Sequence, residues 1–452
     1  MTPNTRLIAL NILNSLEREA SGTLDQVIDA AFSDIPKISQ RDKNLVFSIV
    51  YGTLRRQRHL DWILSQFMKT GIGGLDTPVR NILRLGLFQI VFLSRIPDAA
   101  AVNTAAELTK IIKKPWITRF VNGVLRNAAR GYATISLPGP ETDPELAVAV
   151  EQSMPDWLVQ RWGARFGIAQ LRYLCEAINR IPPTTLRVNT LKTTRDDFLR
   201  HLAGHAREAD ITSLSPDGIR LHHPQTQVSA LPGFAEGAFQ VQDEAAQLVT
   251  LLLDPRPGET VLDACAGMGG KTGHIAQRMH NQGRVLALDI RRDKMKTIRS
   301  EMARLGITIV ETGCYDLIRA SLPDACWFDR VLLDAPCTGL GVLRRNPDIK
   351  WRSSFDRIGR CAAEQRLLLD RVSQYVKPGG CIVYAVCSME PEENEAVISS
   401  FLQNRPDYGI DDGASDISSG VSLPIDTDGC LRTFPHRHDM DGFFAVRLKK
   451  IH

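Results

Sequence analysis

The feature that constrains the fold most is a repeated order of short apolar segment, glycine-rich or polar turn and helical stretch, which begins near residue 240. The segments predicted as strands are 260–264, 284–289, 330–334 and 381–385. Such alternation is typical of a parallel sheet with helices on both faces, an α/β fold. Ligands of these sheets bind beyond the carboxyl ends of the strands. Residues at those ends are therefore the candidates for a binding or catalytic site.

The chain before residue 240 has a different pattern. Leu7, Leu10, Leu13 and Leu16 recur at helical spacing, and breakers interrupt the pattern at 71–78 and 96–98. Few strand signals occur there, which predicts an all-helical domain at 1–136. A linker rich in proline and glycine follows at 137–144.

A mixed segment comes next, with helices predicted at 157–166 and 197–202 and strands at 185–188 and 218–221. We therefore expect a multidomain protein with three parts. These are the helical domain at 1–136, a small α+β module at 145–235 and an α/β Rossmann-like domain at 236–452.

Composition excludes several classes of protein. The 452 residues are 43% hydrophobic and 23% charged, which is usual for a globular protein, and no apolar run is long enough to cross a bilayer. The N-terminus is polar and lacks a signal-peptide core. Nine scattered cysteines without a CxxC pair argue against a disulfide framework or a zinc site. We expect a cytoplasmic monomer with reduced thiols and no bound metal.

The charge is unevenly distributed. Residues 1–133 contain 18 Lys and Arg and 10 Asp and Glu, a net charge of +8, so the rest of the chain carries −4. Basic residues cluster at 55–58, at 113–114, and at Arg119, Arg126 and Arg130. A basic domain joined to a mildly acidic one indicates a polyanionic partner. The alternative is a basic face that only contacts water.

The turn after the first predicted strand, at 263–272, has the sequence Asp-Ala-Cys-Ala-Gly-Met-Gly-Gly-Lys-Thr. Glycines let a backbone approach a ligand closely. The end of the turn matches a phosphate-binding loop, but Cys265 stands where that motif requires glycine. A tight turn without a ligand remains the alternative, and Lys271 could equally be a solvated residue at a helix start. The candidate contacts are Cys265, Ala266, Gly267, Met268, Gly269, Gly270 and Lys271.

Two acids follow the next apolar segments. Asp289 ends the second predicted strand, where a carboxylate can accept hydrogen bonds from ribose hydroxyls, although a helix N-cap is the alternative. Asp316 follows the apolar stretch 307–310 and could hold an adenine edge, or it could be a cap or turn residue.

Two cysteines follow the remaining strands. Cys337 lies in Leu-Asp-Ala-Pro-Cys-Thr-Gly, three residues after Asp334, and Cys387 lies in Tyr-Ala-Val-Cys-Ser. A lone cysteine is usually buried and inert. Two of them at one sheet edge, beside an acid and a nucleotide-type turn, do not fit that simple interpretation and make this edge a candidate site.

Together these segments resemble the RNA cytosine-C5 methyltransferase family, whose pattern has a DxCAxPGGKT turn, an acid after the second strand, a DAPCTG loop and a YxTCS loop. Residues 341–351, Gly-Val-Leu-Arg-Arg-Asn-Pro-Asp-Ile-Lys-Trp, are similar to the bacterial branch that modifies small-subunit ribosomal RNA. Residues 51–55 and 120–127 resemble the RNA-binding domain shared with the NusB antitermination factor.

The resemblance implies transfer of a methyl group from S-adenosylmethionine to carbon 5 of a cytosine in 16S ribosomal RNA, through a covalent cysteine–C6 adduct. It assigns Cys387 as nucleophile, Cys337 to product release and Asp334 to the cytosine edge. The cofactor contacts would be residues 265–271, Asp289, Asp316 and Asp334. The local Pro336-Cys337 pair alone, as in DNA cytosine-C5 enzymes, would favour Cys337 as nucleophile.

The chain departs from the family pattern at three places. Met268 replaces a proline, Val386 replaces a threonine, and Tyr315-Asp316-Leu317 replaces Gly-Asp-Ala. One alternative is that the substrate is transfer RNA. The other is that the protein is a ribosome assembly factor without catalytic activity. Both cysteines and Asp334 are present, which argues against the second alternative.

Overall fold

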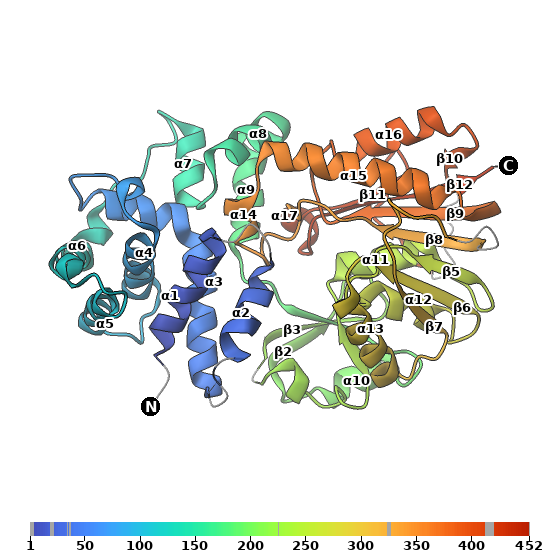
Figure 1. The fold of residues 1–452 in the computed structure, drawn as a ribbon, viewed down its shortest axis with the longest axis horizontal. Helices are drawn as coiled ribbons and strands as arrows, with labels where there is room; N and C mark the ends of the chain where they lie inside the picture. Colours follow the sequence, from blue (N-terminus) through green and yellow to red (C-terminus); the bar gives the residue numbers. More distant parts are fainter. Residues whose placement is uncertain are drawn as a thin grey trace. The chain divides into compact units, whose positions relative to one another are not determined.

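The computed structural model describes residues 4–18, 22–33, 35, 38–224, 226–322, 327–411 and 420–451 (Figure 1). The chain divides into two compact units. The helical unit consists of Met1–Arg180 and Leu343–Arg352, and the sheet unit of Ile181–Val342 and Ser353–His452. The boundary after Arg180 falls inside the range 145–235, so the finer domain limits stay predictions. No helix among the described residues is long and apolar enough to span a membrane.

The first six helices surround one apolar core that contains Leu10, Leu13 and Leu16. Breakers lie at their ends, as expected: Pro78 is in the first turn of a helix and Pro97 is an N-cap. Three more helices complete the amino-terminal part. The bounds are α1 (Thr5–Arg18), α2 (Leu24–Ser33), α3 (Gln40–Ser65), α4 (Thr77–Phe92), α5 (Asp98–Ile111), α6 (Thr118–Gly131), α7 (Pro144–Glu151), α8 (Asp156–Phe166) and α9 (Ile168–Asn179).

A distant segment, Leu343–Arg352, also belongs to the helical unit and ends in the short α14 (Ile349–Arg352). The buried Lys350 ammonium donates to the carbonyls of Arg55 and Ser153, both at 3.0 Å, and to Asn179 Oδ1 at 3.2 Å. In return, Arg55 Nη2 donates to the carbonyl of Arg344 at 2.7 Å. These bonds satisfy donors that would be costly to bury alone.

This arrangement corrects the prediction for Arg55, one member of the basic 55–58 cluster that was expected to face a polyanion. Arg55 is buried, and Arg58 forms an ion pair with Asp156 at 2.7 Å. The Arg56 guanidinium lies over the Phe92 ring, 5.6 Å from its centroid. The sequence gives the charge of these side chains, but it does not show which groups of the same protein they contact.

The sheet unit begins with a small antiparallel sheet in the order β2-β3-β1-β4. The predicted strands at 185–188 and 218–221 and the helix at 197–202 are confirmed, whereas β2 and β4 were not predicted. Leu186, Phe198, Ile219 and Phe239 form its core. The bounds are β1 (Thr184–Val188), α10 (Arg195–His201), β2 (Ala206–Ile211), β3 (Gly218–Pro224) and β4 (Phe239–Val241).

The large sheet has the order β10-β12-β9-β8-β5-β6-β7, with β11 paired to β12. From β9 to β7 the strands are parallel. The parallel pairing of β5, β6, β8 and β9 was predicted, whereas β7 was not predicted as a strand. Because β10, β11 and β12 pair antiparallel, the sheet is mixed. The bounds are β5 (Thr260–Asp263), β6 (Arg284–Asp289), β7 (Val310–Cys314), β8 (Phe328–Asp334), β9 (Val376–Val386), β10 (Tyr408–Ile410), β11 (Cys430–Thr433) and β12 (Phe443–Lys450).

Helices cover both faces of this sheet (Figure 1). One core joins α11 (Glu244–Leu253), α12 (Gly270–Arg278) and α13 (Arg292–Leu305) to the sheet, and the other joins α15 (Phe355–Ser373) and α16 (Glu395–Asn404). Successive strand residues enter opposite cores, as with Val261 and Leu262. Burial on both faces explains the continuous apolar runs in the sequence.

Candidate active site

The turn between β5 and α12 leaves its backbone open. Gly267 and Gly269 have φ angles of +59° and +83°, which side chains other than glycine rarely adopt. A Cβ atom built on Gly267 would have no atom within 4 Å. The Ala266 amide donates to the Leu288 carbonyl at 2.8 Å and ties the turn to β6. A turn of this form admits a ligand close to its backbone.

Asp289 lies buried at the end of β6 and faces this turn. Its carboxylate accepts hydrogen bonds from the Gly267 amide at 3.1 Å and the Arg291 amide at 2.9 Å. It also forms an ion pair with Lys294 at 2.8 Å. The Arg291 bond is of the capping type that sequence left open. The Gly267 bond, however, places the carboxylate against the glycine turn, as a ribose-binding acid requires.

Asp316 follows β7 in a turn of its own. Its Oδ1 accepts hydrogen bonds from the amides of Ile318 at 3.1 Å and Arg319 at 3.2 Å. The Tyr315 amide donates to the Asp289 carbonyl at 3.0 Å, so Asp316 lies one residue beyond a strand pairing with β6. Asp316 therefore stabilises a turn, which was the simpler alternative, and its contact with adenine stays a prediction.

The two predicted cysteines meet at the carboxyl edge of the sheet. Cys337 follows β8, Cys387 follows β9, and their Sγ atoms lie 3.1 Å apart. The hydrogen bond with Cys387, together with burial, raises the pKa of Cys337 well above its usual value. Cys337 therefore remains a protonated thiol at neutral pH, beside a second sulfur that it can contact directly.

Lys271 is not the solvated residue that the simpler interpretation allowed. Its ammonium lies 2.6 Å from Asp334 Oδ2 and 5.2 Å from the centroid of the Phe443 ring. Burial alone would lower the pKa of Lys271, but Asp334, Cys387 and Asp263 raise it above its usual value. A permanent cation is thus held beside Asp334, the acid that ends β8.

Cys265, Met268 and Val386 have other environments. Burial raises the pKa of the Cys265 thiol, which packs against the core beneath the turn, and its predicted contact with the cofactor stays a prediction. The Met268 side chain is 59% exposed, and the glycines on either side still take left-handed conformations without the usual proline. Val386 is fully buried in the core beneath α15, where a threonine hydroxyl would need a partner.

Glu393 is the residue that sequence reasoning missed. Its fully buried carboxylate accepts from the Thr338 amide at 2.8 Å and the Thr338 hydroxyl at 2.5 Å. It also accepts from the Ser388 hydroxyl and from Gln365 Nε2 at 3.1 Å. One carboxylate therefore holds the residues that follow both cysteines. The only signal was an acidic pair, Glu392-Glu393, shortly after Cys387, which resembles a solvated turn.

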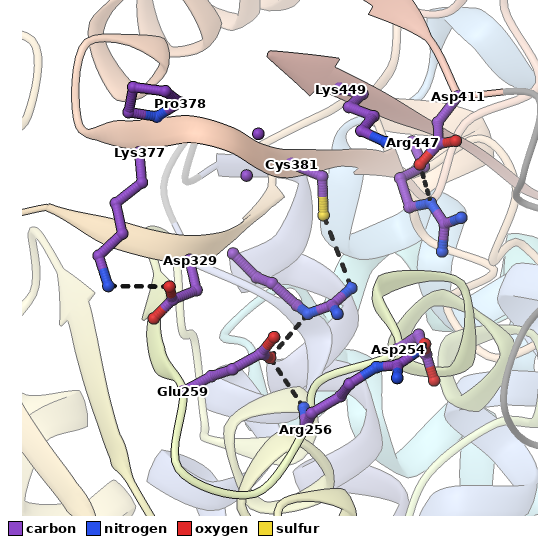
Figure 2. A pocket seen from close by; sticks show the side chains of 13 residues that line it. Asp254, Arg256, Glu259, Asp329, Lys377, Pro378, Cys381, Asp411, Arg447 and Lys449 are labelled. Atoms are coloured by element: carbon purple, nitrogen blue, oxygen red, sulfur yellow. Dashed lines mark hydrogen bonds and ion pairs between the residues drawn. The ribbon is translucent and has the colours of Figure 1, made fainter. Parts of the chain in front are cut away.

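A cavity of about 350 Å³ lies at the opposite edge of the same sheet (Figure 2). Its charged side chains pair with one another: Arg330 with Glu259 at 2.7 Å, Lys377 with Asp329 at 2.8 Å, and Arg447 with Asp411 at 2.8 Å. Such pairing favours a structural ion-pair network. The candidate catalytic and cofactor-binding residues lie instead at the carboxyl ends of the parallel strands.

A parallel sheet with a glycine turn after one strand and an acid after the next is the arrangement of α/β domains that bind nucleotide cofactors, the class that this geometry defines. Residues 250–449 match the family described as 16S rRNA methyltransferase RsmB/F, and residues 3–130 match the NusB family. Residues 154–229 match the ferredoxin-like domain of RsmF/B-like methyltransferases. The chain is 37% identical to the probable ribosomal RNA small subunit methyltransferases B of Synechocystis and of Bacillus subtilis, over 99% of each chain. It therefore belongs to the ribosomal RNA small subunit methyltransferase B family.

Solved structures agree with this fold. The crystal structure of PH0851 is 27% identical, with a TM-score of 0.80 and coverage of 100% of both chains. A methyltransferase homologue from Pyrococcus horikoshii, also 27% identical, has a TM-score of 0.57 over 68% of this chain and 99% of its own. The multidomain prediction, with a NusB-like helical domain, a small α+β module and a Rossmann-like domain, is thus confirmed.

Proposed function

We propose that this protein transfers a methyl group to carbon 5 of a cytosine in 16S ribosomal RNA, through a covalent bond between Cys387 and carbon 6. The observation that carries the proposal is the 3.1 Å separation of the Cys337 and Cys387 sulfur atoms, near the Lys271 ammonium that contacts Asp334. A structural role alone gives no reason for two free thiols to share the ligand edge of the sheet.

The chemistry requires a nucleophile because carbon 5 of cytosine reacts poorly with electrophiles. An electron pair of the Cys387 thiolate forms a bond to carbon 6 and makes carbon 5 nucleophilic. S-adenosylmethionine, when bound, supplies the methyl group. Carbon 5 then loses its proton to a base, the electron pair returns to the ring, and the S–C6 bond breaks. Cys337 enters this last stage, since its sulfur lies 3.1 Å from that of Cys387 and its thiol can donate a proton to the departing thiolate.

Asp334 and Lys271 act as a pair in this proposal. A carboxylate at the end of β8 can accept a hydrogen bond from the exocyclic amine of the cytosine. Lys271, 2.6 Å away, fixes the orientation of that carboxylate. The Glu393 contacts with Thr338 and Ser388 support the same site by fixing the spacing of the two cysteine loops.

The residues of the turn fit the cofactor. The open backbone at Gly267 can approach it, and Asp289 can accept hydrogen bonds from its ribose hydroxyls, with Asp316 at the adenine and Asp334 near the reacting group. Because the Lys294 ammonium already contacts Asp289, it must share that carboxylate with the ribose.

The names of the relatives and the NusB match support small-subunit ribosomal RNA as substrate. The target cytosine must be unpaired or flipped out, because a base inside a stem cannot reach a thiol at a sheet edge. Transfer RNA remains the alternative substrate for the same loops, and no observation favours it.

Transfer of a labelled methyl group to unmodified 16S ribosomal RNA, followed by mapping of 5-methylcytosine, tests the proposal. We expect one labelled cytosine, with transfer RNA unlabelled in the matched reaction. Label on transfer RNA alone, or on another atom of the base, would overturn it.

A further inference from the structure

The helical unit has a cavity that the proposed reaction does not use. It encloses about 780 Å³ beside the start of α3 and the end of α4. That volume lies within the range of sites for small molecules, about 300–1,000 Å³. The lining residues come from α1, from the start of α3 and from the segment 92–96.

The charge of this cavity is positive. Arg6, Arg41 and Arg95 line it, against one carboxylate, Asp42. Asp42 is engaged at the helix start, where its side chain accepts from the Ser39 hydroxyl at 2.7 Å. Arg41 and Arg95 are exposed and have no ion-pair partner among the residues that the structure describes. They differ from Arg55, which is buried, and from Arg58, which forms an ion pair with Asp156.

The rest of the wall combines apolar and hydrogen-bonding groups. Leu45, Leu93, Ile96 and the rim of Phe92, which is 38% exposed, supply apolar surface. One face of the Phe92 ring already stacks on Phe88, with centroids 5.3 Å apart, which holds the ring in place. The polar groups are Ser39, Asn44, Ser48 and Ser94.

We propose that this cavity binds one unpaired nucleotide of the substrate RNA. A nucleotide has an apolar ring, hydrogen-bonding edges and an anionic phosphate, and the cavity offers a counterpart to each. Free arginines can contact phosphate or stack on a base, whereas a paired base has no edge available to the wall. The inference rests on the proposed function, because it requires RNA as the substrate.

The test is the affinity of full-length protein for unmodified 16S ribosomal RNA at several salt concentrations. The variant Arg41→Gln/Arg95→Gln removes two positive charges from the cavity. We expect its affinity to fall about tenfold or more, with a salt slope shallower by about 1 to 2 because phosphate contacts are lost. Its affinity for S-adenosylmethionine should equal that of the wild type.

The matched control is Lys69→Gln/Lys110→Gln, which removes two exposed charges of the helical unit that lie outside the cavity and outside the basic clusters. We expect a loss of less than about threefold. An equal loss in both variants would mean that RNA contacts diffuse charge, and the cavity proposal would be wrong.

A second measurement addresses the nucleotide itself. A photoreactive residue placed at exposed Ser94 should crosslink to an unpaired nucleotide, and single-stranded RNA should compete better than a blunt duplex of equal length. Crosslinks within stems, or equal competition, would overturn the inference. If the wild type fails to methylate 16S ribosomal RNA, the proposed function fails; if it methylates but the cavity variants bind RNA normally, only this inference fails.

Discussion

The sulfur atoms of Cys337 and Cys387 lie 3.1 Å apart although fifty positions separate the two residues in the chain. They meet because β8 and β9 are parallel neighbours whose last paired residues are Asp334 and Ala385. Each cysteine then stands two or three residues past that last pair. The same geometry gives two adjacent thiols different tasks, and substitution of each should have a different outcome.

Cys387→Ala should abolish both methyl transfer and any covalent adduct, because no thiolate attacks carbon 6. Cys337→Ala should still attack and methylate but fail to release the product. A protein–RNA adduct should then survive denaturing electrophoresis. If the adduct accumulates in Cys387→Ala and disappears in Cys337→Ala, the two roles are reversed.

Asp289→Ala should weaken the binding of S-adenosylmethionine. Loss of a hydrogen bond to a charged acceptor costs about 1.5–3 kcal/mol, which is roughly tenfold or more in affinity. Calorimetric titration of the folded variant measures this loss. The control is Asp293→Ala, which removes an exposed acid from the first turn of α13, and its affinity should be unchanged. Wild-type affinity in Asp289→Ala would contradict the ribose assignment.

Glu393→Gln should slow methyl transfer while leaving cofactor affinity intact. The amide keeps the shape of the side chain, but only one of its two terminal atoms can accept hydrogen bonds. Either the Thr338 and Ser388 hydroxyls on Oε2 or the Thr338 amide and Gln365 Nε2 on Oε1 therefore lose their acceptor. We expect a stability loss of about 1–3 kcal/mol from the unpaired buried groups. Single-turnover rates should fall more than the affinity for RNA, and an unchanged rate would show that the loops hold their spacing without Glu393.

Asp263 predicts a pH dependence of stability. Burial raises the pKa of this carboxyl from 3.8 to about 7 in the folded protein. Between those values the folded state holds a proton that the unfolded state has released, so stability falls as pH rises toward 7. The fall approaches about 1.4 kcal/mol per pH unit for this group. In Asp263→Asn, which cannot titrate, the unfolding free energy should lose this slope between pH 5 and 7, and an unchanged slope would contradict the assignment.

Sequence predicted the centre of the large sheet well, because strands buried on both faces are nearly continuous apolar runs. It did not predict the antiparallel edge, since the pairing direction of β12 depends on which strand it joins. The site residues at strand ends followed from the same rule of sheet topology. Glu393 could not be predicted, because an acid becomes a structural centre only when hydroxyls and amides from distant loops converge on it.

The charge pattern was predictive only in part. Net charge marks the helical domain as basic, but Arg55 and Arg58 serve internal contacts. The exposed arginines at 41 and 95 are isolated in the sequence and form no visible cluster. Their proximity arises when the start of α3 packs near the end of α4.

The seat of Lys350 in the helical unit has a consequence for biosynthesis. The ribosome makes residues 1–180 first, but their last packing partner, Leu343–Arg352, emerges only after 162 further residues of the sheet unit. The amino-terminal helices therefore cannot complete their packing during their own translation, although domains commonly fold in order of synthesis. Until then the carbonyls of Arg55 and Ser153 lack the ammonium that they bind in the finished protein. The helical unit can therefore finish folding only after the ribosome has made the chain beyond the Cys337 loop.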